Sequence, residues 1–318
     1  MRLKMNFSRI TVIFFLVTSV LASLTGLKAG DRLRIVTTTP DLASIANEIG
    51  GERVETFAIA KGYQDPHFVD AKPSYIIELQ KADMFIQMGL DLEIGWAPPL
   101  LDGARNPDIL PGGKGYLDAS AGVPLLQVPT GDPATLRAQG DIHIYGNPHY
   151  WLDPLRGKII ARNIFGGLAR LQPENRAEFQ KNLDLFDQKL DQEMAKWEKQ
   201  MQPYRGTKIV AFHNSWPYFE ERFGLQIVGF IEPKPGIPPT PKHLVEVIKT
   251  MQEQGVKIII ISPYYSQKSS ELVASKTGAK VLELATSVEA FPGINDYFAL
   301  FDYNLGKMLQ AFQESGNN

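Results

Sequence analysis

The feature that most constrains the fold is a run without glycine or proline, from Ala177 to Met201. Apolar residues recur along it every three or four positions, which is the spacing of one helix face. They are Phe179, Leu183, Phe186, Leu190, Met194 and Trp197. Opened at Pro173, a helix of about 28 residues would be about 42 Å long. This length is greater than a helix within one lobe requires, so we interpret the helix as a rigid connector that joins two lobes. An ordinary packed helix with a frayed end is the alternative.

Strand and helix patterns alternate on both sides of this run. Before it, we predict strands over 33–38, 54–60 and 84–88, and helices over 41–49, 73–82 and 154–171. After it, we predict strands over 208–212, 225–231, 257–261 and 280–284, and helices over 216–223, 241–254, 268–277 and 295–312. Such alternation argues for parallel sheets covered by helices. The stretch 104–148 is rich in Gly and Pro and poorly periodic, so no element is predicted there.

We therefore predict an α/β fold of two (β/α) lobes, each with a mostly parallel sheet, joined by one long helix. The N-terminal lobe would cover 30–172, the linker helix 173–203 and the C-terminal lobe 204–318.

The first residues have the pattern of a signal peptide over 1–29. Arg2, Lys4 and Arg9 form a basic start, and Ile10–Ala22 is apolar and uncharged. Small residues that suit cleavage stand at Ala22 and Ala29. A membrane anchor is the alternative, but the apolar run is shorter than the roughly 20 residues that a spanning helix needs. We expect export to the periplasm.

The composition excludes several classes of protein and of binding site. The chain has no cysteine, which excludes disulfides, thiolate metal sites and the lipid attachment of a lipoprotein. A formal net charge of -2 gives no basic surplus for nucleic acid. No Gly-rich phosphate loop, nucleophile elbow or His-Glu-x-x-His motif is present, so we do not predict an enzyme.

Three of the five histidines share a context. His67 ends Asp65-Pro66-His67, His149 ends Asn147-Pro148-His149, and His213 follows a predicted strand. Because ligands bind at the carboxyl ends of parallel strands, we expect these three side chains to converge. Neutral imidazole favours zinc, copper, nickel and iron over calcium and magnesium. His143 is interpreted as a loop residue with at most transient metal contact, and His243 as structural or solvated.

Several motifs resemble one family. They are Thr37–Leu42, Asp65–His67 with Lys72–Ser74, Ala82-Asp83 with Gly89–Glu93, Asn147–Pro154, Pro173–Asn175, and Phe212-His213 with Tyr218-Phe219. Through nearly the whole mature chain, the sequence resembles the solute-binding proteins of ABC importers for zinc and manganese. The resemblance implies two lobes joined by one long helix, with the metal in the cleft between them.

By this resemblance, His67 and His149 would be the ligands of the N-terminal lobe and His213 the first ligand of the C-terminal lobe. A third histidine in this family tends to go with zinc and a glutamate with manganese, which favours Zn²⁺, with Mn²⁺ as the alternative. The protein, expected to be a monomer, would deliver the ion to an ABC transporter permease in the inner membrane.

The sequence departs from the family at the fourth ligand. Thr286 stands where the family has an acidic residue. Water could complete the site, Glu289 or Glu283 could reach in, or the site could bind more weakly. We favour three histidines with water, because Glu283 belongs to a predicted strand. The histidine-rich loop of many zinc receptors is also missing.

Asp65 and Asp153 are candidate acceptors for histidine N–H groups. Because Asp153 precedes Pro154, helix capping is the favoured interpretation there.

Two other functions remain open. A receptor for manganese or iron would have the same fold. A periplasmic zinc hydrolase would use an open three-histidine site whose bound water ionises near pH 7. No general base accompanies such a site in the sequence, which argues against the hydrolase.

Overall fold

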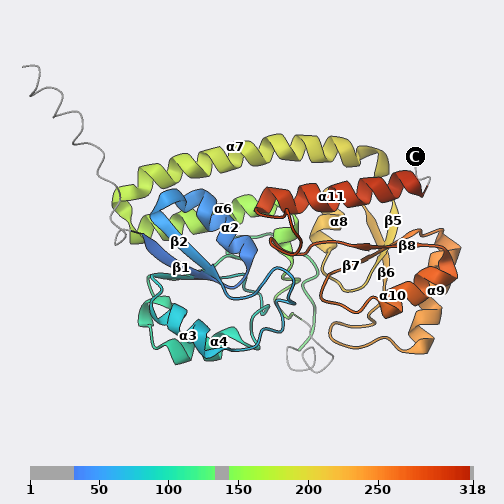
Figure 1. Cartoon of the computed structure of the whole chain (residues 1–318), viewed down its shortest axis with the longest axis horizontal. Coiled ribbons are helices and arrows are strands. Elements are labelled where there is room, and N and C mark those ends of the chain that lie inside the picture. Colours follow the sequence, from blue (N-terminus) through green and yellow to red (C-terminus); the bar gives the residue numbers. More distant parts are fainter. Residues whose placement is uncertain (1–31, 133–142, 316–318) are drawn as a thin grey trace, which may run out of the picture. The chain divides into compact units, whose positions relative to one another are not determined.

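Each half of the chain builds one four-stranded parallel sheet in a computed structural model that describes residues 32–132 and 143–315 (Figure 1). The first sheet contains β1 (Leu33–Thr37), β2 (Val54–Ala58), β3 (Met84–Gln87) and β4 (Tyr116–Asp118), in the order β2-β1-β3-β4. The second contains β5 (Lys208–Ala211), β6 (Gln226–Phe230), β7 (Ile258–Ile261) and β8 (Lys280–Glu283), in the order β6-β5-β7-β8. Every neighbouring pair is parallel. The predicted α/β fold is confirmed, and the two halves share one strand order.

Helices cover both faces of each sheet. Those of the first half are α2 (Pro40–Gly50), α3 (Pro73–Gln80), α4 (Ala97–Ala104) and α6 (Pro154–Leu171). Those of the second are α8 (Pro217–Phe223), α9 (Pro241–Gln254), α10 (Lys268–Thr277) and α11 (Tyr297–Glu314). Short 3₁₀ turns are η2 (Gly51–Arg53), η3 (Pro107–Ile109), η4 (Tyr150–Leu152), η5 (Pro173–Asn175) and η6 (Gln202–Tyr204). Many of the helices open on proline, whose missing N–H would have had no helical partner there.

Side chains of β1 alternate between two hydrophobic clusters. Ile35 lies in a cluster with α2 and α6, whereas Val36 lies in one with α3 and α4. This alternation is the period of two that a strand imposes. It places α2 and α6 on one face of the first sheet and α3 and α4 on the other (Figure 1).

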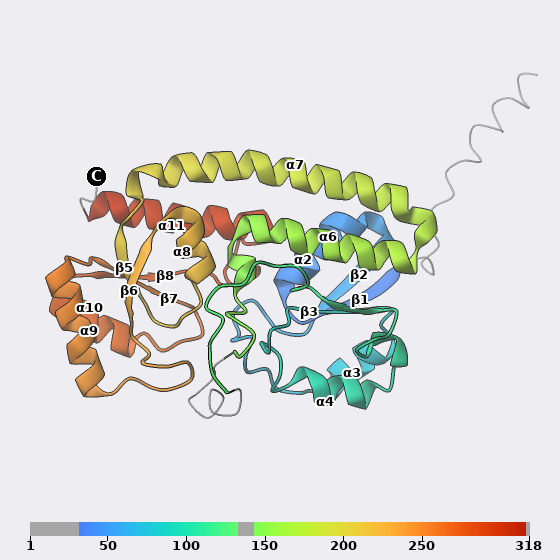
Figure 2. The ribbon, with the colours of Figure 1, turned by 180° about the vertical axis from the view of Figure 1, so that it is seen from behind.

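The long helix α7 (Arg176–Met201) runs past both halves (Figure 2). All six residues of its predicted apolar stripe are buried. At 1.5 Å per residue, its 26 residues span about 39 Å, and 3₁₀ turns extend both ends. Trp197 and Phe186 pack against α11, each 5.3 Å from a phenylalanine ring. One hydrophobic cluster therefore continues from the first half through α7 into the second.

Two elements lie where the sequence predicted none. The strand β4 has only three residues, too few to show a period, and α4 carries two prolines in its first turn. The described residues from Leu33 onward belong to one contact unit, so the lobe boundaries at 172 and 204 stay a prediction. The predicted leader 1–29 lies outside the described residues. Within those residues, every helix is too short or too polar to span a membrane.

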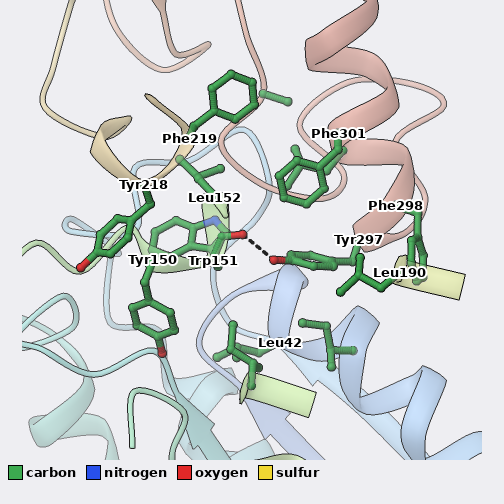
Figure 3. Close-up of a cluster of buried hydrophobic side chains, with 14 of the residues drawn as sticks. Leu42, Tyr150, Trp151, Leu152, Leu190, Tyr218, Phe219, Tyr297, Phe298 and Phe301 are labelled. Carbon is green, nitrogen blue, oxygen red and sulfur yellow. Dashed lines mark hydrogen bonds between the residues drawn. The ribbon is translucent and has the colours of Figure 1, made fainter. Parts of the chain in front are cut away.

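Aromatic side chains and their hydrogen bonds to backbone carbonyls tie the halves together (Figure 3). The Tyr297 hydroxyl donates to the Trp151 carbonyl oxygen over 2.6 Å. The Trp151 indole N–H in turn donates to the Thr286 carbonyl oxygen over 2.8 Å. Tyr218 lies in the same cluster, and its hydroxyl donates to the Asn147 carbonyl oxygen. These buried bonds fix the segment that follows His149 against the second half.

Asp41, at the start of α2, also links the first half to the second. Its carboxylate accepts hydrogen bonds from the Ser287 hydroxyl at 2.5 Å and the Val288 N–H at 3.0 Å. Burial raises the pKa of Asp41 to about 7, although both hydrogen bonds oppose the rise. The native state therefore holds a proton that the unfolded chain has already lost near pH 4.

We predict that this proton makes stability fall as the pH rises. Between about pH 4 and pH 7 the native state binds more protons than the unfolded state, so the free energy of unfolding decreases with pH. The side chain at position 41 carries no charge at any pH in Asp41→Asn, so this part of the decrease should vanish. It amounts to at most about 1.4 kcal/mol of unfolding free energy for each unit by which the pKa of Asp41 is raised. Urea unfolding of metal-free protein at several pH values measures it. Asp184→Asn, at an exposed site on α7, is the control. Parallel stability curves for wild type and Asp41→Asn would contradict the prediction.

Candidate metal centre

Three buried histidines converge between the two halves. Ligand atoms of His67, His149 and His213 all lie within 4.8 Å of one another. The ring centroids are 5.1 Å apart for His67 and His149, and 5.6 Å from each of these to His213. Rings at this separation, with nitrogens turned inward, leave room for one cation among them. The convergence expected from the sequence is therefore present in the fold.

The three side chains reach this place from different local structures. His213 stands two residues beyond β5, at the carboxyl end of the sheet, as expected. His67 lies in the long loop between β2 and α3. His149 follows no described strand and is the N-cap of η4. The expectation of three strand ends was therefore wrong for His149, whose place is fixed by a loop instead.

Each of these imidazoles gives its Nδ1 proton to an acceptor. Nδ1 lies 2.7 Å from an Asp65 oxygen in His67, 2.9 Å from the Asn147 side-chain oxygen in His149, and 2.5 Å from a Glu232 oxygen in His213. Carboxylate and amide oxygens only accept, so these contacts assign the proton to Nδ1. In the neutral ring, Nε2 then carries the lone pair that a metal ion needs.

The two loop histidines are positioned by the same local device. The Asp65 carboxylate accepts the backbone N–H of His67 at 3.0 Å, and the Asn147 side chain accepts that of His149 at 3.0 Å. In both motifs a proline separates the two residues and restricts the backbone. The side chain of the first residue thus holds both the backbone and the ring of the third.

His149 presents an unpartnered nitrogen inside the protein. Its side chain is 1% exposed, and Nε2 is a buried polar atom without a hydrogen-bond partner. Burial, followed by the neighbouring His67 and His213, lowers the pKa of His149 well below its usual value. The ring is therefore neutral at physiological pH, the form that binds metals.

The acceptors also connect the halves. The Asn147 amide donates to the Asn214 carbonyl oxygen at 2.9 Å, directly beside His213. Tyr265, from the second half, lies beside Asp65. Burial alone would raise the pKa of Asp65, yet bonding to His67 holds it below its ordinary value. Groups that orient the first-half histidines thus themselves contact the second half.

A pocket opens onto His149 and His213 from solvent. Residues of both halves line it: Gln127, Pro129, His143, Asn147, His149, His213, Asn214 and Pro235. An ion could thus reach the rings between the two halves.

The acidic candidates for a fourth ligand lie elsewhere. In the described parts of the chain, the group with convergent ligand atoms contains neither Glu283 nor Glu289. The Thr286 hydroxyl lies 3.2 Å from the Tyr264 hydroxyl, and its carbonyl accepts from Trp151. None of the three contributes to the cluster.

Asp153 serves structure rather than the site. Its carboxylate caps α6 through the Leu155 N–H and pairs with Arg156 and Arg222. The capping interpretation is confirmed. His243 is bound to the Phe230 carbonyl oxygen at 2.9 Å.

Three residues of the centre were missed from the sequence. Asn147 could have been found, because Asn147-Pro148-His149 repeats the pattern of Asp65-Pro66-His67. Glu232 lies 19 positions from His213 and carries no local signal. His143, interpreted as a loop residue, points its Nε2 at the Nε2 of His67 over 3.1 Å.

Comparisons with known proteins agree on one class. The family model described as zinc-uptake complex component A, periplasmic (ZnuA), matches residues 35–311. A manganese ABC transporter substrate-binding lipoprotein, PsaA of Streptococcus pneumoniae, is 25% identical over 296 residues, covering 90% of this chain and 91% of PsaA.

Solved structures share the fold. A crystal structure of ZnuA superposes with a TM-score of 0.76 at 26% identity, covering 88% of this chain and 99% of ZnuA. FpvC of Pseudomonas aeruginosa, solved with Mn²⁺, has a TM-score of 0.74 at 22% identity, covering 90% of this chain and all of FpvC (100%). Because the family model spans most of the sequence, the chain belongs to the ZnuA family of metal-binding substrate-binding proteins of ABC importers, which are not enzymes.

Proposed function

We propose that this protein is a periplasmic zinc receptor, which binds Zn²⁺ with His67, His149 and His213 and delivers it to the permease of an ABC importer in the inner membrane. The observation that carries the proposal is the buried, unpartnered Nε2 of His149, placed among two further imidazoles. Leaving such an atom without a partner costs free energy, and a bound cation removes that cost.

The donor set supports zinc. Within the described residues, the cluster offers imidazole nitrogens and no carboxylate oxygen. Imidazole suits zinc, whereas manganese prefers oxygen donors. The relatives are named for both metals, since PsaA is a manganese protein and ZnuA a zinc protein. The proposal for zinc therefore rests on the donors of this chain, and manganese and iron are the competing outcomes.

Binding and release would follow the separation of the halves. His67 and His149 belong to the first half and His213 to the second, so an ion bound to all three holds the halves together. Moving the halves apart removes His213 from the coordination sphere and frees the ion. The expected behaviour is one bound ion per chain without turnover.

Export is part of the proposal. The signal-peptide pattern of 1–29 supports a periplasmic location, and the sequence has no cysteine to carry a lipid. In this it would differ from PsaA, which is named a lipoprotein. We propose that the mature protein acts as a monomer.

The ligand assignment predicts the effect of two substitutions. His67→Ala and His213→Ala each remove an imidazole from opposite halves, and each should weaken zinc binding at least 100-fold. Isothermal titration of metal-free protein measures this, with metal content by mass spectrometry. His243→Ala, outside the cluster, should bind as the wild type does. Full zinc content in both ligand variants would show that the site is assigned wrongly.

The choice of metal is tested by competition. When equal concentrations of Zn²⁺ and Mn²⁺ are offered to the metal-free protein, zinc should occupy most sites, because the donors are imidazoles. Fe²⁺ is tested in the same way without oxygen. Preferential loading with manganese or iron would replace zinc in the proposal and leave the receptor function intact.

The acceptors of the Nδ1 protons predict a smaller effect. Glu232→Gln keeps an oxygen acceptor for His213 but removes the negative charge, as Asp65→Asn does for His67. Each should weaken zinc binding about 10- to 100-fold, the usual range for residues that orient metal ligands. Glu220→Gln, a partly buried carboxylate away from the cluster, is the control. Unchanged affinity in both variants would mean that the acceptors only support the loops.

A further inference from the structure

We propose that His143 is the fourth metal ligand, in place of the acidic residue that Thr286 replaces. This deepens the proposed function and depends on it. The observation is the approach of His143 to His67, whose two Nε2 atoms are 3.1 Å apart, with ring centroids 5.1 Å apart. His143 also lines the same pocket as His149 and His213.

The separation suits two ligands of one ion. Two nitrogens that bind zinc at 2.0–2.1 Å with a tetrahedral angle lie about 3.3 Å from each other. The distance between His67 and His143 is close to this value before any ion is placed. For His143 to join the same ion as His149 and His213, its ring must move toward them, because His143 lies outside the group whose ligand atoms are all within 4.8 Å of one another.

The proton positions favour a cation between these atoms. The Nδ1 proton of His67 is given to Asp65, so its Nε2 presents a lone pair. The ring of His143 also lies beside the Leu90 backbone. If that ring carries its proton on Nδ1, its Nε2 also presents a lone pair toward His67. Two lone pairs then face each other, an arrangement that repels unless a cation lies near both.

The backbone of Leu90, beside His143, lies in a strained turn. Leu90 and Asp91 have φ of 56° and 66°, in the left-handed region that side chains disfavour. Behind the turn, the buried Glu93 carboxylate accepts the N–H groups of Met88 at 2.7 Å and Gly89 at 3.1 Å. Strain of this kind persists where surrounding structure enforces it, often at functional sites.

The charge of the ion is also balanced without an acidic fourth ligand. Four neutral imidazoles leave the double positive charge of the ion intact. The two carboxylates behind the rings, Asp65 and Glu232, supply two negative charges close to it. An acidic ligand at position 286 would add a third, so a neutral ligand fits this centre better.

X-ray absorption at the zinc edge tests the proposal on the full mature protein loaded with one Zn²⁺. We expect four imidazole nitrogens around zinc in the wild type. In His143→Ala and His143→Gln we expect three imidazoles with one oxygen donor, and binding at least 10-fold weaker. His243→Ala should keep four imidazoles and the wild-type affinity.

The outcomes separate this inference from the function. If wild type and both His143 variants showed the same three imidazoles and the same affinity, His143 would not be a ligand, while zinc binding would still stand. If the wild type bound no zinc, manganese or iron, the receptor function itself would fail, and this inference with it.

Discussion

The donation of an Nδ1 proton from each converging histidine to a neighbouring acceptor is the interaction on which the centre depends. An imidazole has two nitrogens, and which of them can bind a metal is decided by where the proton lies. Asp65, Asn147 and Glu232 keep that proton on the outer side of His67, His149 and His213 respectively. The inner nitrogens are thereby directed toward the centre before any ion arrives, which would lower the entropy lost on binding.

The fold makes this arrangement depend on both halves at once. Asn147 donates to the Asn214 carbonyl and Tyr265 lies beside Asp65, so the acceptors in the first half contact the second. The Trp151 indole, whose ring lies 5.3 Å from that of His149, is anchored to Thr286 in the same way. When the halves separate, the ion would lose His213, and the remaining ligands would also lose part of their orientation. Ion binding and closure of the two halves would therefore depend on the same contacts.

Much of the fold could be predicted from the sequence, because its signals are local. The stripe of α7 is visible at a period of 3.6, and α9 and α10 begin and end where the pattern placed them. The strand β4 could not be predicted, since three residues carry no period. In the centre, the convergence of three histidines was predicted from their context. The bonds of Glu232 and His143 were not, because they join residues 19 and 76 positions apart and exist only after folding.

The continuous apolar stripe of α7 has a consequence for the chain as a polypeptide. Its residues pack against α2 and α6 at one end and against α11 at the other, within a single hydrophobic cluster. A chain cut on either side of this helix would yield a fragment with an uncovered apolar groove and another with an uncovered apolar helix. Each half has one hydrophobic cluster of its own, but the cluster that contains α7 is shared. A protease that removed one half would expose the other half's part of this shared cluster, an apolar surface that promotes aggregation.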